Sequence, residues 1–380
     1  MRVTGDWLTR PQTQAVCAVL TKAGYRALLV GGCVRNALLG EAVADVDIAT
    51  DAEPAIVIRL VEASGLRAVP TGLEHGTLTV VADGIPHEVT TFRKDVVTFG
   101  RHARVAFSTR VEEDAARRDF TMNALYATPE GDVIDPLNAL PDLVARRLRF
   151  VGDAGARITE DYLRILRFFR FHAWYGDPAA GLDAEALAAC AAHAVGLDRL
   201  SRERVGAEIR KLLSARDPAP AVAAMAQAGL LGHVLPGADA RALPALVHLE
   251  AGRSPDWLRR LAVLGGEDPA ERLRLSRAEA RTLNSLRSGL LSMDTPAALG
   301  HRYGPDTAAN VVLGRAALRG AAPLEGWDKD IAQGAAARCP VTAADLMPHL
   351  SGAALGERLA ALEARWIASG FRLSREDLLR

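Results

Sequence analysis

The sequence lacks long hydrophobic runs, paired cysteines and any excess of one charge. No apolar stretch reaches the roughly 20 residues that a membrane-spanning helix needs, and the first residues, MRVTGDWLTR, lack the apolar core of a signal peptide. The four cysteines form no C-x-x-C pair, which argues against a zinc site or a disulfide framework. Lys plus Arg and Asp plus Glu both number 46, which argues against wholesale basic binding of nucleic acid. We therefore expect a cytoplasmic protein without membrane contact.

With 380 residues the chain is too long for one ordinary core. In the first third, short β-like runs alternate with turn residues, which predicts a small mixed sheet with helices, an α+β domain over 1–135. The predicted strands are 27–30, 46–49, 76–82, 87–92 and 132–136, and the predicted helices are 11–23, 33–39, 54–64 and 112–124. Beyond Pro136 strand-like alternation disappears and helical spacing continues to the end, which predicts an all-α remainder.

A glycine pair, Gly31 and Gly32, lies between a short apolar run and a predicted helix. Without a Cβ, these residues let backbone N–H groups approach a polyphosphate, and the positive end of the helix dipole favours the same charge. Arg35 would add a forked cation. The glycines are adjacent rather than spaced as G-x-G-x-x-G, which disfavours a dinucleotide-binding fold. The segment therefore predicts a phosphate cradle.

Two aspartates, Asp45 and Asp47, follow that helix. If Val46 and Ile48 belong to a strand, both carboxylates point to one face. Neighbouring carboxylates repel each other unless a cation lies between them, and two Mg²⁺ ions would suit in-line attack on phosphorus. If the strand that carries Glu88 lies beside this one, Glu88 could supply a third acidic group to the metals or to the attacking hydroxyl. The combination of cradle and carboxylates predicts nucleotidyl transfer.

Two further segments have less decisive patterns. Residues 117–124, RRDFTMNA, are expected to continue a helix, with Arg118, Asp119 and Asn123 bordering a cleft or simply lying at the surface. A carboxylate can accept from ribose hydroxyls and an arginine can pair with phosphate. Residues 95–113 have no clear period, which fits either a mobile loop beside the carboxylates or an ordinary surface excursion.

The segment 160–171, EDYLRILRFFRF, is predicted to form one helix with Asp161 and Arg164 on its polar side. One interpretation is an intrahelical ion pair worth about 0.2 to 0.5 kcal/mol. The other is base selection, because cytosine and adenine each present an exocyclic amine beside an unprotonated ring nitrogen. Asp161 would accept from the amine and Arg164 would donate to the ring nitrogen. Uracil and guanine would leave buried polar groups unpaired, at about 1 to 3 kcal/mol each.

These segments, in order, resemble a known family. The segments GGCVRN with DVDIAT, TGLEHGTLTVV with HEVTTFRKD, RRDFTMNALY, EDYLRILRFFRF and SRERVGAEIRKLL resemble the class II, bacterial-type tRNA nucleotidyltransferases, which add CCA to tRNA 3′ ends. The resemblance covers about residues 27–215, and extends more loosely to the C-terminal tail. It implies a nucleotidyltransferase head over 1–135, a helical neck over 136–215, and a helical body and tail over 216–380 that bind tRNA.

The resemblance also implies roles for individual residues. Catalytic Mg²⁺ is assigned to Asp45 and Asp47, with Glu88 as a candidate third carboxylate. Gly31, Gly32 and Arg35 would face the triphosphate. Asp119 would contact the ribose, and Arg118 and Asn123 would line the nucleotide pocket. The amino-acid template that selects CTP and then ATP is assigned to Glu160, Asp161 and Arg164. Residues 95–113 match the flexible loop linked to the switch between nucleotides.

Several alternatives and departures accompany this hypothesis. Bacterial poly(A) polymerases of the same superfamily typically carry a basic, phenylalanine-containing signature where this chain has TGLEHGTLTVV. Enzymes that add only CC or only A differ from full CCA-adding enzymes largely in the flexible loop. The corresponding segment here, residues 95–113, looks complete, which favours full CCA addition. A nonenzymatic RNA-binding relative would be expected to lose one Asp of the pair, and a nucleotidyl donor to proteins would not need the helical half. Asn36 stands where the family usually has Asp. The sequence contains no His-Asp doublet, so a fused metal phosphohydrolase domain is not expected.

Overall fold

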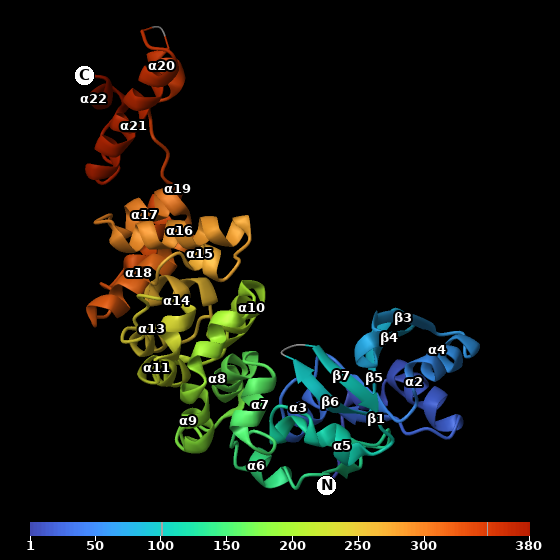
Figure 1. The fold of residues 1–380 in the computed structure, drawn as a ribbon. Coiled ribbons are helices and arrows are strands. Elements are labelled where there is room, and N and C mark those ends of the chain that lie inside the picture. The colour runs from blue at the N-terminus through green and yellow to red at the C-terminus, as the bar shows by residue number, and fades with distance from the viewer. Residues whose placement is uncertain (100–101, 348) are drawn as a thin grey trace. The chain divides into compact units, whose positions relative to one another are not determined.

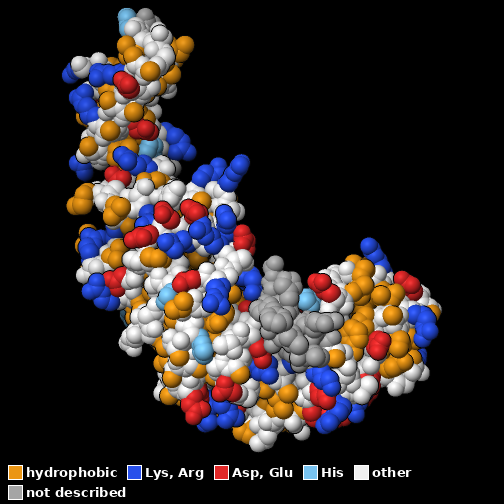
Figure 2. Space-filling view, viewed as in Figure 1, with side chains coloured by type: hydrophobic (Ala, Val, Ile, Leu, Met, Phe, Trp, Pro, Cys, Tyr) orange, Lys and Arg blue, Asp and Glu red, His pale blue; other side chains and the backbone are white. Residues whose placement is uncertain are grey.

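The computed structural model describes residues 1–99, 102–347 and 349–380, with side chains described outside 95–105. The chain divides into two compact units (Figure 1). The first comprises Met1–Glu208 with Gln227–Val234, and the second comprises Ile209–Ala226 with Leu235–Arg380. On the face in view, basic and acidic side chains are interspersed over both units (Figure 2). The units do not test the expected division at 135, 215 and 380, which stays a prediction.

The first unit is built around a mixed sheet with the strand order β3-β4-β5-β2-β1-β8-β9. Its strands are β1 (Leu28–Val30), β2 (Asp47–Thr50), β3 (Arg67–Gly72), β4 (Thr77–Ala82), β5 (Ile85–Thr91), β8 (Tyr126–Ala127) and β9 (Val133–Ile134). Neighbouring strands are antiparallel, except that β2 and β5 run parallel. A separate hairpin consists of β6 (Arg93–Phe99) and β7 (His102–Phe107).

One face of the sheet is covered by helices, as the period-2 pattern of β4 requires. Leu78 and Val80 are fully buried on the side where α2 (Pro11–Lys22) and α4 (Pro54–Ala63) contact this strand. The alternate residues of β4 are only partly buried. The opposite face of β4 and β5 is thus more open, and it is the face on which polar strand residues lie.

The remaining helices of the first unit are mostly short. They are α1 (Asp6–Thr9), α3 (Gly32–Leu39), α5 (Val111–Ala116), α6 (Leu140–Val144), α7 (Ala154–Glu160), α8 (Leu163–Tyr175), α9 (Ala184–Ala192) and α12 (Leu230–Val234). Three short 3₁₀ helices are η1 (Leu73–His75), η2 (Thr121–Asn123) and η3 (Ala194–Arg199). Helices α10 (Arg202–Leu213) and α11 (Ala219–Gln227) each include residues of both units.

The described residues of the second unit form helices joined by turns, with an isolated β-bridge between Ala238 and Gly265. Its further helices are α13 (Leu243–Leu249), α14 (Trp257–Leu264), α15 (Pro269–Arg272), α16 (Arg277–Leu291), α17 (Pro296–Tyr303), α18 (Pro305–Arg319), α19 (Trp327–Ala336), α20 (Ala343–Leu346), α21 (Gly352–Ala368) and α22 (Arg375–Leu379). Helices α17 and α19 pack closely, because a Cβ at Gly334 would lie 1.8 Å from the carbonyl oxygen of Ala297. No described helix combines the length and the apolarity that crossing a membrane requires.

The core of the second unit contains a buried charge cluster. Glu250 accepts from Arg259 Nε at 2.7 Å and from Arg260 Nη2 at 2.7 Å. Arg260 also donates to the carbonyl oxygen of Leu213 at 2.6 Å, at the end of α10. Because every partner is hydrogen-bonded, the cluster fixes α14 against the end of α10 without leaving a buried charge unpaired.

The α+β head and the helical remainder expected from the sequence are confirmed. The expected helix over 112–124 is wrong beyond Ala116, because Phe120 is extended and forms an isolated β-bridge with Phe150. The segment 95–113, expected to lack regular structure, forms part of the β6–β7 hairpin and of α5. Its residues 100–101 lie outside the described residues, and its mobility stays a prediction.

Candidate active site

The acidic residues predicted from the sequence come together at the start of β2. Asp47 begins this strand and lies opposite Glu88 in the parallel pairing of β2 with β5. Asp45 lies two residues earlier, before the strand rather than inside it. Burial raises the pKa of Asp47 to about 6, the carboxylates of Glu88 and Asp45 add to the rise, and Arg118 opposes it. The sequence predicted this juxtaposition, and the strand pairing places Glu88 beside Asp47.

The glycine pair lies next to the same carboxylates. Strands β1 and β2 are antiparallel, so the end of β1 meets the start of β2. The Cys33 thiol lies 3.3 Å from the carbonyl oxygen of Val30 and 4.0 Å from that of Asp47. Gly31 has a φ of 71°, and a Cβ there would lie 3.3 Å from Arg118 Nη1. A side chain at this position would therefore strain the backbone and crowd the arginine.

Arg35 is buried and its guanidinium already has protein partners. It donates to Asn123 Oδ1, to Asn36 Oδ1 at 2.9 Å and to the Tyr175 hydroxyl at 2.9 Å. It also lies 3.9 Å from the centre of the Tyr175 ring, a cation–π contact. Burial lowers the pKa of Arg35. The structure thus gives Arg35 a packing role between α3 and α8, and its contact with a triphosphate stays a prediction.

Arg118 belongs to a buried network with a carboxylate that the sequence analysis missed. Asp114 Oδ2 accepts from Arg118 Nη2 at 3.0 Å and from the Tyr126 hydroxyl at 2.7 Å, while Oδ1 accepts from Arg117 Nε at 2.8 Å. Burial alone would raise the pKa of Asp114, but the two arginines and Tyr126 outweigh it and lower the pKa to about 2. The signal in the sequence was an acidic residue four positions before an arginine at the end of a helix.

Asp119 and Asn123, both predicted to contact the nucleotide, lie together. Asp119 Oδ1 accepts from Asn123 Nδ2 at 3.0 Å, and Oδ2 accepts from Arg167 Nε at 2.8 Å. Burial raises the pKa of Asp119, but Arg167 and these hydrogen bonds lower it to about 2 overall. Arg167, three residues after Arg164 on α8, was also missed. The Asp119 carboxylate is therefore held by the protein on both oxygens.

The segment predicted to be one helix over 160–171 is broken at Asp161. Asp161 is extended, with φ −154° and ψ 105°, so α7 ends at Glu160 and α8 begins at Leu163. Asp161 Oδ1 accepts from the backbone N–H of Leu163 at 3.1 Å. This local bond satisfies an N–H at the start of α8 that has no partner within the helix, which explains why the sequence pattern does not continue as one helix.

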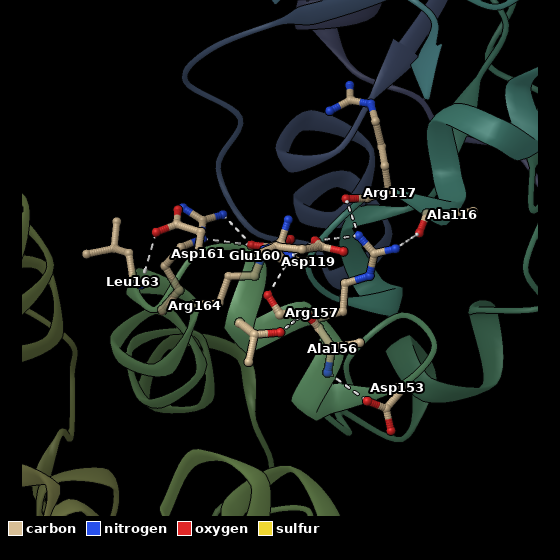
Figure 3. A network of polar contacts seen from close by, with 12 residues as sticks. Ala116, Arg117, Asp119, Asp153, Ala156, Arg157, Glu160, Asp161, Leu163 and Arg164 are labelled. Carbon is tan, nitrogen blue, oxygen red and sulfur yellow. Dashed lines mark hydrogen bonds and ion pairs between the residues drawn. The ribbon is translucent and has the colours of Figure 1, made fainter. Parts of the chain in front are cut away.

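The break gives adjacent acidic residues different partners (Figure 3). Glu160 Oε2 accepts from Arg157 Nη1 at 2.9 Å and from Arg164 Nη1. Arg157 also donates to the carbonyl oxygens of Ala116 and Arg117, which joins α7 to the end of α5. In the described part of the chain Asp161 and Arg164 form no ion pair with each other. The interpretation of these two residues as an intrahelical ion pair is therefore wrong.

The carboxylates fit a divalent cation held jointly with a substrate. Within 1–99, 102–347 and 349–380, no three His, Cys, Asp or Glu side chains form a preassembled metal cage. Mg²⁺ usually binds through one or two carboxylates together with substrate phosphates and water. Asp47, whose ionised form is disfavoured by burial and by two neighbouring carboxylates, would be relieved by such a cation. The residues present therefore fit a site that is completed by the phosphates of a nucleotide.

Comparisons with known proteins find similarities in two parts of the chain. Residues 27–149 match the family model described as the poly(A) polymerase head domain, and residues 181–241 match a probable RNA- and SrmB-binding site of polymerase A. The part of the chain that carries the main sheet and the carboxylates is thus similar to the head domain of poly(A) polymerases. Proteins named CCA-adding enzymes are among those similar to this chain, as the following comparisons show.

The chain is 42% identical over 215 residues to the CCA-adding enzyme of Lacticaseibacillus paracasei, covering 55% of this chain and 52% of that one. It is 36% identical over 263 residues to the CCA-adding enzyme of Leuconostoc citreum, covering 69% and 60%. The structure of the Bacillus stearothermophilus CCA-adding enzyme in complex with CTP matches with a TM-score of 0.75 at 28% identity, covering 95% of this chain and 94% of that one. The chain spans about half the length of the curated relatives it matches.

Proposed function

We propose that this chain adds C, C and A to the 3′ end of tRNA, using CTP and ATP and requiring Mg²⁺. The pairing of Asp47 with Glu88, near the turn at Gly31 that we propose binds phosphate, supports this proposal. Relatives at 36% and 42% identity are named CCA-adding enzymes, which supports the same activity. The cytoplasmic location and the division into head, neck, body and tail are part of the proposal.

The reaction is a substitution at phosphorus. The tRNA 3′-oxygen forms a bond to the α-phosphorus of CTP or ATP, the bond from that phosphorus to the bridging oxygen breaks, and pyrophosphate leaves. Asp45 and Asp47 would hold the cation, which when bound supplies stabilisation of negative charge on the attacking oxygen and the phosphates. Glu88, opposite Asp47 on the neighbouring strand, would hold the hydroxyl or accept its proton.

The remaining residues would bind and orient the nucleotide. The backbone at Gly31 and Gly32, at the start of α3, would face the phosphates. Arg118 interacts electrostatically with Asp47, so its charge is felt at the reacting end of the site. Asp119, Asn123 and Arg118 would line the ribose and nucleotide pocket. In this arrangement Arg35, through its hydrogen bonds to Asn123 and Tyr175, would hold α3 and the turn before it in place.

Base selection would follow from hydrogen-bonding edges. Asp161 accepts and Arg164 donates, which matches the amine and the unprotonated ring nitrogen shared by cytosine and adenine. Glu160 binds Arg164 and so would fix the direction of its donors. Uracil and guanine present carbonyl and N–H groups in the reverse order, which would leave the protein groups unpaired.

The test uses tRNAs that end before C74, C75 or A76, incubated with the pure protein and each labelled nucleoside triphosphate separately. With CTP we expect two C residues to be added to the tRNA that ends before C74 and one to the tRNA that ends before C75. With ATP we expect one A to be added to the tRNA that ends before A76, and no further extension in any case. Long adenylate tails on any RNA would instead identify a poly(A) polymerase. Extension of only one class of end would identify a CC-only or A-only enzyme, and no addition with Mg²⁺ or Mn²⁺ would reject nucleotidyl transfer.

A further inference from the structure

Asp161 is held by an arginine from a distant part of the sequence. Arg204, in the first turn of α10, donates from Nη2 to Asp161 Oδ2 at 2.6 Å and from Nη1 to Oδ1 at 3.2 Å. This is a forked pair in which one guanidinium contacts both oxygens of one carboxylate, a geometry that fixes the plane of the acid. Both side chains are about one-quarter to one-third exposed, at 24% and 31%, so the site is open to a ligand.

Among the residues whose side chains are described, the contacts leave Asp161 with one free acceptor position. A carboxylate offers about four lone-pair positions, two on each oxygen. Oδ1 accepts from the Leu163 N–H and from Arg204 Nη1, and its positions are therefore used. Oδ2 accepts from Arg204 Nη2, which leaves one position on this oxygen. A single directed acceptor is what one exocyclic amine of a base requires.

Arg164 shows the complementary arrangement. Its Nη1 donates to the carbonyl oxygen of Arg157 at 2.6 Å and to Glu160. Among the residues whose side chains are described, none accepts from its Nε or Nη2. A guanidinium carries five N–H donors, so donors remain available to a ring nitrogen. Each selecting residue is thus fixed on one side by the protein and open on the other.

We propose that Arg204 is a positioning residue for base selection, which orients Asp161 so that its one open acceptor faces the base amine. This inference rests on the proposed nucleotide addition and deepens it. Without the guanidinium, the carboxylate can rotate about its last bond and its acceptors lose their direction. Recognition of cytosine and adenine then weakens, whereas uracil and guanine, which never used that acceptor, are affected less.

A structural role for Arg204 alone would have a different result. The ion pair joins the α7–α8 break to α10, and loss of that connection would loosen the site for every nucleotide. A second ion pair provides the matched control, because Arg170 of α8 donates from Nε to Glu208 of α10 at 2.5 Å without contacting Asp161. Removing it loosens α10 against α8 while leaving the acceptor in place.

The experiment compares the wild-type chain with Arg204→Gln, Arg204→Lys and Arg170→Gln. Single-turnover kcat/KM is measured for CTP and UTP on tRNA ending before C74, and for ATP and GTP on tRNA ending before A76. We expect Arg204→Gln to lower the CTP:UTP and ATP:GTP ratios by about tenfold, a change that corresponds to about 1.4 kcal/mol. Arg204→Lys keeps the charge but not the fork, and should give an intermediate loss.

Arg170→Gln should leave both ratios within about twofold of wild type, whatever its effect on absolute rates. The positioning role would be overturned if kcat/KM fell equally for all four nucleotides in both Arg204 variants, or if the CTP:UTP and ATP:GTP ratios did not change. Circular dichroism and thermal melting identify a variant that does not fold, and Arg204→Lys then carries the test. Failure of the wild-type chain to add any nucleotide would reject the proposed function itself, and is thereby distinguishable.

Discussion

Asp47 lies directly opposite Glu88 in the one parallel pairing of the main sheet as described, between β2 and β5. Neighbouring strands are about 4.8 Å apart, so the two carboxylates are held close together by the backbone itself. The rigid sheet, rather than a loop, therefore maintains their separation. Like charges fixed at this distance store repulsion that a cation can relieve.

Removal of either cation-holding carboxylate should abolish the reaction. We predict that Asp45→Ala and Asp47→Ala each lower the rate of addition of both CTP and ATP by about 10³-fold or more, since charge stabilisation by metal is worth several kcal/mol. Asp51→Ala is the control, because Asp51 lies just after β2 and its side chain accepts from the backbone N–H of Arg26. Comparable activity of Asp47→Ala and Asp51→Ala would contradict the assignment.

Replacement of Arg164 should affect the choice of base more than the overall rate of nucleotide addition. We predict that Arg164→Ala narrows the preference for CTP and ATP over UTP and GTP by about tenfold, because the donor to the ring nitrogen is lost. Competition between labelled nucleotides on one tRNA end measures the preference directly. An unchanged preference in this variant would reject the template role of Arg164.

Arg35 should be a stability residue. Its replacement by methionine leaves the Asn123 and Tyr175 partners without their donor, so we predict a loss of about 2 to 4 kcal/mol in the free energy of unfolding of the first unit. Urea denaturation followed by circular dichroism measures it. Unchanged stability together with a raised KM for nucleotide would instead support direct phosphate contact.

Asp114 and Asp119 should make the first unit sensitive to acid. Both pKa values are lowered to about 2 in the folded chain, below the ordinary value of 3.8 that applies after unfolding. Their contribution to stability, about 2 kcal/mol each, is therefore complete above pH 4 and is lost as the pH falls from about 4 to about 2. Urea denaturation at several pH values measures this slope.

Asp119→Asn provides the comparison for this pH dependence. The variant should be less stable at neutral pH, and its stability should decline less steeply than that of the wild type between pH 4 and pH 2. Parallel curves for the two proteins in this window would show that Asp119 does not contribute. The contribution of Asp114 to stability, which the variant retains, accounts for the loss of stability that remains as the pH falls.

Local patterns were enough to predict the elements that form the site. The glycine pair, the Asp-x-Asp spacing and the alternation around Glu88 each depend on near neighbours in sequence. In the structure Asp47 lies opposite Glu88, and β1, which precedes the glycine pair, is paired with β2, whereas Asp45 lies before the strand. Partners from distant segments were not predictable in this way. Arg167 for Asp119 and Arg204 for Asp161 lie 48 and 43 residues away in the chain. The continuous helix over 160–171 was expected because an aspartate that binds its neighbour's backbone has no periodic signature.

The helix break at Asp161 also restricts how this chain can vary. Glu160 and Asp161 are consecutive, yet one binds arginines of α7 and α8 while the other binds an arginine of α10. A substitution at either position alters one set of contacts, but inserting or deleting a single residue between Arg157 and Leu163 would displace both acids from their partners, because each residue of a helix adds about 100° of rotation. This short stretch is therefore one where length, more strictly than residue identity, must be preserved in functional variants.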